Sequence, residues 1–357
     1  IGDTERRKVM PLLIHGDTAF IGQGVVAETF NLGTVEAYTT GGTVHVVINN
    51  QLGYTALPHE GFGTEYCTDF AKMLQVPIFH VNADDPEACC HVMQLAMAYR
   101  SRFQRDVVID MVCYRKYGHN EGDDPSFTQP LMYDTIKNHS STYAIYQAQL
   151  ADEGTMSKDD SKKVRDDHTD VMQKALDKAK EGVEGEREMF NGIWSEYSLE
   201  DKDEADTSIS EKTLKAISDA TVSWPDSFTP HPKVAKGMEK RSENLLEGGM
   251  DWGAAEMAAY GSLVSEGVSV RLTGQDARRG TFSHRHGVLI DYKTAPPYTP
   301  LQTIATGDAE LEIHNSTLSE YAVMGFEFGY SMSSPKNLTV WEAQFGDFAN
   351  GAQVVID

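Results

Sequence analysis

Basic residues are scarce in this sequence. Lys and Arg together number 31, against 54 Asp and Glu, which gives a formal net charge of −23 over 357 residues. A nucleic acid backbone requires a basic surface, so this balance argues against nucleic acid as a partner, and we interpret the acidity as a source of solubility. The sequence also contains no run of about 18 apolar residues and no signal peptide, so we expect no membrane span.

Cysteine is equally scarce. The four cysteines, at positions 67, 89, 90 and 113, show neither CxxC spacing nor a Cys/His ligand pattern. They are therefore interpreted as reduced thiols in a reducing compartment. The chain is long enough for two domains. It begins at Ile1 without a Met and ends inside an apolar run, so we expect it to be part of a longer protein.

Two polar clusters each follow a short apolar run. The runs at residues 10–14 and 43–48 predict buried strands, and Asp17 and Asn50 come just after them. Ligands bind at the carboxyl ends of strands in an open parallel sheet, so both side chains are expected to face one crevice. A carboxylate, an amide and a backbone carbonyl suit Mg²⁺. A helix predicted to start at Gly22 would attract a phosphate, and a metal-bridged diphosphate is the expected ligand.

The order of further elements predicts an α/β fold. Strands are expected at residues 77–81 and 106–113 and a helix after Asp85, which indicates a doubly wound parallel sheet over residues 1–140. His119 follows the last of these strands and is placed at the same edge as Asp17. A helical connector with one buried apolar stripe, including Val164, Val171 and Leu176, is expected within residues 141–247. A second α/β domain is expected over residues 248–357, with a helix over 252–266 and a strand over 268–273.

Two motifs suggest other chemistry and are weaker. Residues 22–27 satisfy the dinucleotide pattern GxGxxA, but they stand several residues beyond the strand, and the next strand ends in asparagines rather than an acid. NAD is therefore disfavoured. In the loop at residues 278–286, His284 and His286 could bind a metal, although they lack a nearby acid or thiol. Their combination with the arginines of the loop fits a site that binds a substrate carboxylate and moves protons.

Several stretches resemble a known family. Gly16-Asp17 followed by Asn49-Asn50 resembles the thiamin-diphosphate motif of transketolase-like enzymes, with Thr18 where Gly is usual. Longer stretches resemble the first component (E1) of the 2-oxoglutarate dehydrogenase complex: HGDTAFIGQGVVAETFNL, NNQLGYT, YRKYGHNEGDDPSFTQP, RLTGQDARRGTFSHRH, NSTLSEYAVMGFEFGY and WEAQFGDFANGAQ. The resemblance covers nearly the whole chain outside residues 140–245.

The resemblance implies a fold and an activity. The fold would consist of two doubly wound, transketolase-like domains that bind thiamin diphosphate, joined by the helical connector. The activity would be oxidative decarboxylation of 2-oxoglutarate in the tricarboxylic acid cycle, with transfer of the succinyl group to a lipoyl group on an E2 partner. A homodimer is implied, located in the bacterial cytoplasm or the mitochondrial matrix. Two alternatives remain. One is another thiamin-diphosphate enzyme, such as a transketolase or a pyruvate-specific E1, and the other is a catalytically incomplete interface fragment.

The resemblance also implies roles for individual residues. Asp17, Asn50 and the Leu52 carbonyl would bind Mg²⁺. The remaining cofactor contacts would come from Thr18, Ala19, His119, Glu320 and Phe345. Glu320 would share a proton with N1′ of the aminopyrimidine, and Phe345 would lie against that ring. His119 would lie beside the reaction centre. The loop with His284 and His286 would face the substrate, and His286 is preferred over His284 for this role.

Overall fold

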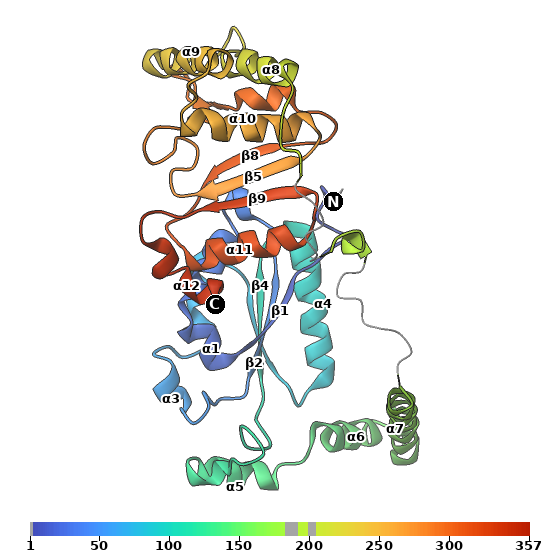
Figure 1. Cartoon of the computed structure of the whole chain (residues 1–357). Coiled ribbons are helices and arrows are strands. Elements are labelled where there is room, and N and C mark those ends of the chain that lie inside the picture. Colours follow the sequence, from blue (N-terminus) through green and yellow to red (C-terminus); the bar gives the residue numbers. More distant parts are fainter. Residues whose placement is uncertain (1–2, 183–191, 199–204) are drawn as a thin grey trace. The chain divides into compact units, whose positions relative to one another are not determined.

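The chain divides into two compact units, residues 1–187 and 188–357. The computed structural model describes residues 3–182, 192–198 and 205–357. Each unit contains its own parallel β-sheet with helices packed on it (Figure 1). This arrangement confirms the predicted α/β fold class. Within the described residues, no helix is both long enough and apolar enough to cross a membrane.

The sheet of the first unit has four parallel strands in the order β1-β2-β4-β3. Their bounds are β1 Leu12–Gly16, β2 Val44–Asn49, β3 Ile78–Asn82 and β4 Val107–Val112. Side chains alternate between the two faces of β2, so Val47 joins a core with Phe20 and Phe30, whereas Val44 and Val46 join another. Because both faces are covered, β2 is apolar at most positions.

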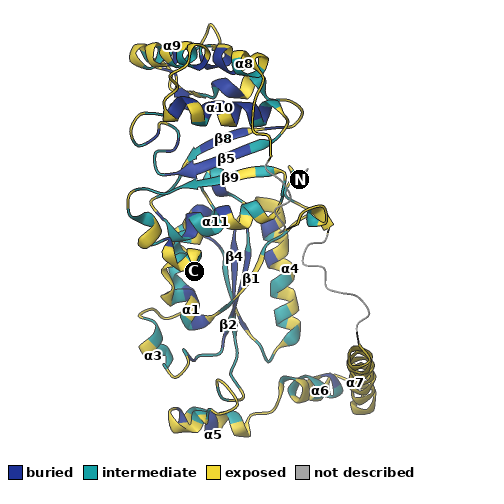
Figure 2. Ribbon diagram, viewed as in Figure 1, coloured by how far each residue is buried: buried dark blue, intermediate teal, exposed yellow. Residues whose placement is uncertain are grey.

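The edge strand β1 differs from expectation. Residues 10–14 predict a buried strand, but Leu12, Leu13 and Ile14 are 47%, 40% and 69% exposed (Figure 2). β1 pairs only with β2, so its other edge and much of its surface are left uncovered by the described residues. An apolar run does not reveal whether its strand is central or at an edge, and this prediction was wrong.

The helices of the first unit also correct two expectations. They are α1 Asp17–Gly22, α2 Gly24–Leu32, α3 Pro58–Gly61, α4 Pro86–Phe103, α5 Pro130–Asn138, α6 Thr142–Asp152 and α7 Lys158–Lys180. The helix expected to begin at Gly22 is α2, which begins at Gly24, and it is preceded by a separate short helix, α1, that opens at Asp17. The apolar stripe on α7 is exposed rather than buried, with Val164, Val171 and Leu176 between 49% and 61% exposed. Helical periodicity predicted the helix correctly but not a partner for its stripe.

The second unit is built on the sheet β8-β5-β9, with all strands parallel. Its elements are α8 Glu211–Thr221, α9 Pro232–Glu247, α10 Trp252–Ser265, β5 Ser269–Gly274, β6 Leu289–Ile290, β7 Pro297–Tyr298, β8 Leu311–Asn315, α11 Tyr321–Met332, β9 Asn337–Glu342 and α12 Gln353–Ile356. One core joins Ile217 of α8, Leu245 of α9 and Met257 of α10 to Leu272 of β5. The segment expected as a connector therefore contributes α6 and α7 to the first unit, and α8 and α9 to the core of the second.

Candidate functional site

A cavity of about 460 Å³ lies at the carboxyl ends of β1 and β2 in the first unit. It is lined by Gly16, Asp17, Thr18, Ala19, Gly22, Gln23, Asn50, Leu52, Gly53 and Tyr54. The sequence suggested five residues of this unit, besides His119, as ligands of the metal and the diphosphate. All five line the cavity: Asp17, Thr18, Ala19, Asn50 and Leu52. They converge because parallel strands place their carboxyl ends at one edge of the sheet.

Asp17 is a buried carboxylate without a cation. Its side chain is 2% exposed, and no Lys, Arg or His of the described residues forms an ion pair with it. Burial, with a contribution from Asp110, raises the pKa of Asp17, while N–H groups of Asp17 and Thr18 and the Thr18 hydroxyl oppose the rise. A buried anion is costly unless something compensates for its charge. The cavity therefore suits a positively charged ligand beside Asp17.

The loop after β2 presents Asn50 and Leu52 to the same cavity. The Leu52 N–H donates to the Asn50 side-chain oxygen over 3.0 Å, which closes a tight turn. Asn49 instead points into the sheet, where its Nδ2 donates to Asp110, and Gln51 donates to the Cys113 carbonyl. No N–H or O–H of the described residues donates to the Leu52 carbonyl. One side-chain amide and one free carbonyl thus accompany the Asp17 carboxylate.

This donor set fits a hard divalent cation. It contains oxygen atoms only, and within the described residues no group of three or more His, Cys, Asp or Glu side chains could bind a metal. A site with a single carboxylate leaves coordination positions for water and for phosphate oxygens, which is the arrangement that Mg²⁺ favours. The unpaired Asp17 charge is the structural observation that supports such an ion here.

Thr18 fixes the distance between the two halves of the cavity wall. A Cβ at Gly53 would lie 2.6 Å from the Thr18 hydroxyl and 2.7 Å from its methyl group. The loop after β2 can therefore approach α1 only because residue 53 is a glycine. Thr18, which stands where the resembled motif has Gly, is accommodated through Gly53.

His119 lies at the edge of this cavity. Its ring packs edge-on against the Tyr54 ring, with centroids 4.5 Å apart, and Tyr54 lines the cavity. The His119 N–H donates to the Asp123 carboxylate over 2.8 Å, which orders the loop that carries it. His119 is exposed, so its imidazole is accessible to a ligand in the cavity.

Glu320 stands at the start of α11 in the second unit, but it does not cap the helix. Its side chain forms no capping hydrogen bond, although an acid in this position is usually attributed to the helix dipole. The Gln275 side-chain N–H lies 3.5 Å from Glu320 Oε1 and equally far from Asp347 Oδ2. A Cβ at Gly351 would stand 2.7 Å from Glu320 Oε2. Gln275 and Gly351 therefore set the position of this carboxylate.

A short hydrogen-bond chain connects that region to the loop at residues 278–286. Thr281 donates to the Gln344 side chain over 2.7 Å, and Gln344 donates to the Gln275 carbonyl over 2.9 Å. Phe345 follows Gln344 and is 81% exposed, with its ring 6.4 Å from that of Phe282. This exposed aromatic ring, on the residue that follows Gln344, is available to stack on a planar ligand.

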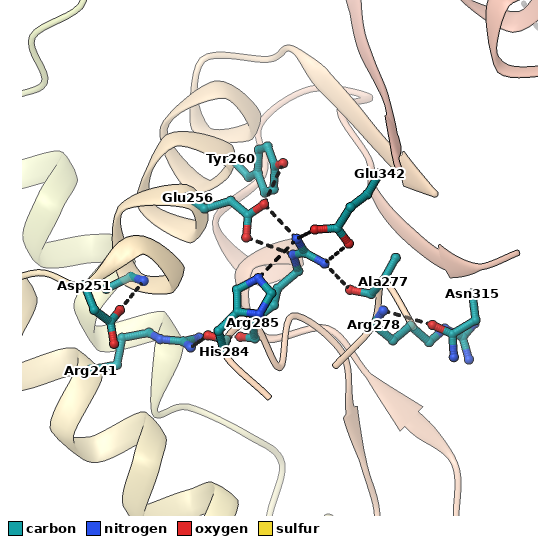
Figure 3. A network of polar contacts seen from close by, with 11 residues as sticks. Arg241, Asp251, Glu256, Tyr260, Ala277, Arg278, His284, Arg285, Asn315 and Glu342 are labelled. Carbon is teal, nitrogen blue, oxygen red and sulfur yellow. Dashed lines mark hydrogen bonds and ion pairs between the residues drawn. The ribbon is translucent and has the colours of Figure 1, made fainter. Parts of the chain in front are cut away.

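Arg285 belongs to the same loop and anchors it to neighbouring elements (Figure 3). Its guanidinium is fully buried and forms bidentate contacts with Glu256 of α10 and Glu342 of β9, at 2.6–2.9 Å. It also donates to the Ala277 carbonyl. Figure 3 shows the two carboxylates converging on the guanidinium from different elements. Arg285 therefore ties the loop to α10 and to the end of β9.

The two histidines of the loop face α9 instead. Arg241 of α9 donates to the carbonyls of His284 and Arg285, each over 2.6 Å, and Ser283 shares a 2.8 Å hydrogen bond with His286. Burial, followed by the charges of Arg241 and Arg279, lowers the pKa of His286. Within the described residues, no hydrogen bond or ring contact joins either histidine directly to Glu320 or Phe345. The ring of Phe282 links the two sides, because it lies 6.2 Å from His284.

The sequence interpretation missed three residues of this region: Gln275, Gln344 and Arg285. A signal for Gln275 existed, because it directly follows strand β5, where polar residues meet ligands. Gln344 likewise follows β9. Arg285 gave no such signal, since the sequence does not show which of several loop cations is buried and paired.

Comparison with known proteins identifies both parts of the chain. Residues 2–187 match the family described as dehydrogenase E1 component, and residues 248–357 match the transketolase pyrimidine-binding domain. Both are thiamin-diphosphate-binding domains of the transketolase-like fold. The chain is 46% identical over 363 aligned residues to proteins of Mycobacterium sp. strains JLS and KMS, each named "Multifunctional 2-oxoglutarate metabolism enzyme". All of this chain is covered, but it spans only 29% and 28% of the lengths of those relatives.

Proposed function

The chain belongs to the dehydrogenase E1 component family, and on this premise we propose that it binds thiamin diphosphate with Mg²⁺ and decarboxylates 2-oxoglutarate. The named relatives act in 2-oxoglutarate metabolism, which supports this choice of 2-oxo acid. The four-carbon fragment that remains after CO₂ is lost would be oxidised by the lipoyl disulfide of an E2 partner, which is thereby reduced and receives the succinyl group as a thioester. The observation that carries the proposal is the cavity in which buried, unpaired Asp17 meets Asn50 and the free carbonyl of Leu52.

The residues of the first unit hold the metal and the diphosphate. Asp17, Asn50 and the Leu52 carbonyl would bind Mg²⁺, which would compensate for the buried Asp17 charge. Thr18 and Ala19, at the start of α1 in the cavity wall, would contact the diphosphate. His119, which is exposed and packs against Tyr54, would exchange a proton beside the reaction centre.

The residues of the second unit act on the other end of the cofactor. Thiamin diphosphate, when bound, supplies a carbon nucleophile and an electron sink for 2-oxo acid decarboxylation. Glu320 would hold a proton at Oε1 or Oε2 and share it with the aminopyrimidine, and Gln275 lies 3.5 Å from this carboxylate. Phe345 offers its exposed ring to the pyrimidine. His286, with His284, helps to bind the substrate from the loop that Arg285 secures.

Calorimetric titration of thiamin diphosphate tests the first part of the proposal. We expect saturable binding in Mg²⁺ and none in EDTA. Asp17→Ala should weaken binding at least about 100-fold, which corresponds to about 2.7 kcal/mol. Asp170→Ala, which removes an exposed carboxylate from α7, should bind like the wild type. Metal-independent binding, or unchanged binding by Asp17→Ala, would contradict the proposed role of Asp17.

Mixing two inactive variants tests how the sites are assembled. We propose a homodimer in which Asp17 of one subunit serves the same site as Glu320 of the other. Asp17→Ala and Glu320→Gln should each lose about 100-fold or more of 2-oxoglutarate decarboxylation in the protein at its native length. Their mixed dimer contains one site with both defects and one with neither, so it should regain activity. If each site were built from one subunit, every site would carry a defect and no activity would return.

A panel of 2-oxo acids tests the substrate. The highest kcat/KM should belong to 2-oxoglutarate, because cationic and histidine side chains of the second unit favour a second carboxylate. Preference for pyruvate, or turnover of a ketose phosphate, would indicate instead a pyruvate-specific enzyme or a transketolase.

A further inference from the structure

A second cavity, of about 710 Å³, lies within the second unit between α9 and the loop at residues 278–286. It is lined by His231, Lys233, Val234, Gly237, Met238, Lys240, Arg241, Asn244, Gly249, Asp251, Ser283, His284 and His286. Three of these side chains are permanent cations, three are histidines and one is an acid. A net positive lining is unexpected in a chain of charge −23.

The charges on α9 are segregated in a way that produces this lining. The acids Glu239, Glu243 and Glu247 follow one another at four-residue intervals and therefore share a helix face. None of them lines the cavity. Lys233 and Lys240 are seven residues, or two turns, apart and do line it. The helix thus turns Lys233, Lys240 and Arg241 toward the cavity and its acids away from it, whereas Lys236 does not line the cavity.

The two lysines have no anionic partner in the described part of the chain. Neither Lys233 nor Lys240 takes part in an ion pair there. The acid in the wall, Asp251, already accepts the Ala254 N–H as the cap of α10. Arg241 uses two of its donors on the loop carbonyls but contributes its charge to the cavity. The positive charge of the lining is therefore largely uncompensated.

We propose that this cavity is a binding site for a multivalent phosphate-bearing anion. A single carboxylate cannot meet both lysines, which are separated by about 10 Å along the helix axis. A diphosphate carries several charges that the lysines can share, and Ser283 and His286 add hydrogen-bonding groups on the opposite wall. The cavity lining includes none of the residues of the Asp17 cavity, but it shares His284 and His286 with the loop proposed to bind the substrate.

Calorimetric titration of inorganic pyrophosphate tests the proposal. The titration is done in EDTA, so that metal-dependent binding near Asp17 is suppressed. The wild-type chain should bind pyrophosphate saturably. The double variant Lys233→Gln/Lys240→Gln should bind at least about tenfold more weakly. Lys162→Gln/Lys163→Gln on exposed α7 makes the same change in net charge and should bind like the wild type. Circular dichroism of each variant verifies that it is folded.

Two further ligands determine the class of anion. Tighter binding of adenosine diphosphate than of pyrophosphate would assign the phosphates to an organic ligand, and equal binding would assign the site to the phosphates alone; both results support the proposal. It is overturned if folded wild type shows no saturable pyrophosphate binding, if both double variants bind equally, or if succinate binds as tightly as pyrophosphate. Because metal is absent, none of these results depends on whether thiamin diphosphate binds at Asp17.

Discussion

The two cavities carry opposite charges, and each lacks the counter-charge that would neutralise it. In the first unit, Asp17 is buried without a cation. In the second, Lys233 and Lys240 face a cavity without an anionic partner. An unpaired buried charge such as that of Asp17 lowers the stability of the free protein, so its presence points to a ligand rather than to packing, whereas Lys233 and Lys240 are exposed to solvent. The overall charge of −23 predicted neither local pattern.

Arg285 is an example of a charged residue with a structural role. It is more deeply buried than either lysine, yet two carboxylates and a carbonyl satisfy it. Burial alone therefore does not distinguish a binding group from a structural one. The presence or absence of a partner does, and three substitutions test this distinction.

The largest effect is expected for Arg285→Met. Loss of the guanidinium leaves Glu256 and Glu342, which are 15% and 26% exposed, without their cation. Removing one partner of a buried ion pair costs roughly 3–5 kcal/mol. Urea unfolding followed by tryptophan fluorescence should show this loss, because all four tryptophans, at positions 194, 224, 252 and 341, belong to the second unit. Arg279→Met, in the same loop but with an exposed ion pair, should cost less than about 1 kcal/mol. If both variants lost the same free energy of unfolding, the contrast between a buried and an exposed ion pair would be contradicted.

An intermediate effect is expected from the pH dependence of the first unit. Burial lowers the pKa of His45 to about 3, with a further contribution from His15, whose Nε2 lies 3.1 Å from His45 Nδ1. Asp106 lies 4.0 Å away but does not reverse this, since its own pKa is raised by burial. The folded state keeps His45 neutral while the unfolded state takes up a proton below its ordinary pKa of 6.5. Stability from this group is therefore complete above pH 6.5 and lost as the pH falls toward 3.

The measurement is the difference between wild type and His45→Gln. At pH 5 the wild type should have lost about 2 kcal/mol through this group relative to pH 7, at about 1.4 kcal/mol per pH unit. His45→Gln should lack this slope, whatever its stability at pH 7. Far-UV circular dichroism during urea unfolding reports the change, and tryptophan fluorescence of the second unit should not follow it. Identical slopes for both proteins would show that His45 titrates normally.

The smallest effect, and the one with an unusual sign, is expected for Asp17→Asn. Burial raises the pKa of Asp17, so the ionised group destabilises the free fold above that pKa, and the penalty disappears as the pH falls below the ordinary value of 3.8. At pH 7 without metal, Asp17→Asn should be more stable than the wild type by roughly 1 kcal/mol, the usual scale of a point substitution. Mg²⁺ with thiamin diphosphate should stabilise the wild type and not the variant. A variant that is less stable in EDTA would show that Asp17 is satisfied within the fold.

The sequence predicted the Asp17 cavity because strand periodicity and the parallel-sheet rule act locally. Asp17, Asn50 and Leu52 each follow a strand by a few residues, so assigning β1 and β2 was enough to bring them together. The same rule could have pointed to Gln275, which directly follows β5, but it could not show the approach of Gln275 to Glu320, which is 45 residues away. The α9 cavity was not predicted, since its two walls come from separate elements that meet only in the folded unit.

By itself, the sequence determined the α/β class, the position of most strands and the family, because these depend on periodicity, on strand ends and on long motifs. Only the tertiary structure decided which groups are buried and whether they are paired. It left the apolar runs of β1 and α7 exposed, paired Arg285 twice, and left Asp17 without a cation. The physical reason is that burial and pairing depend on neighbours distant in the chain, and no local pattern contains them.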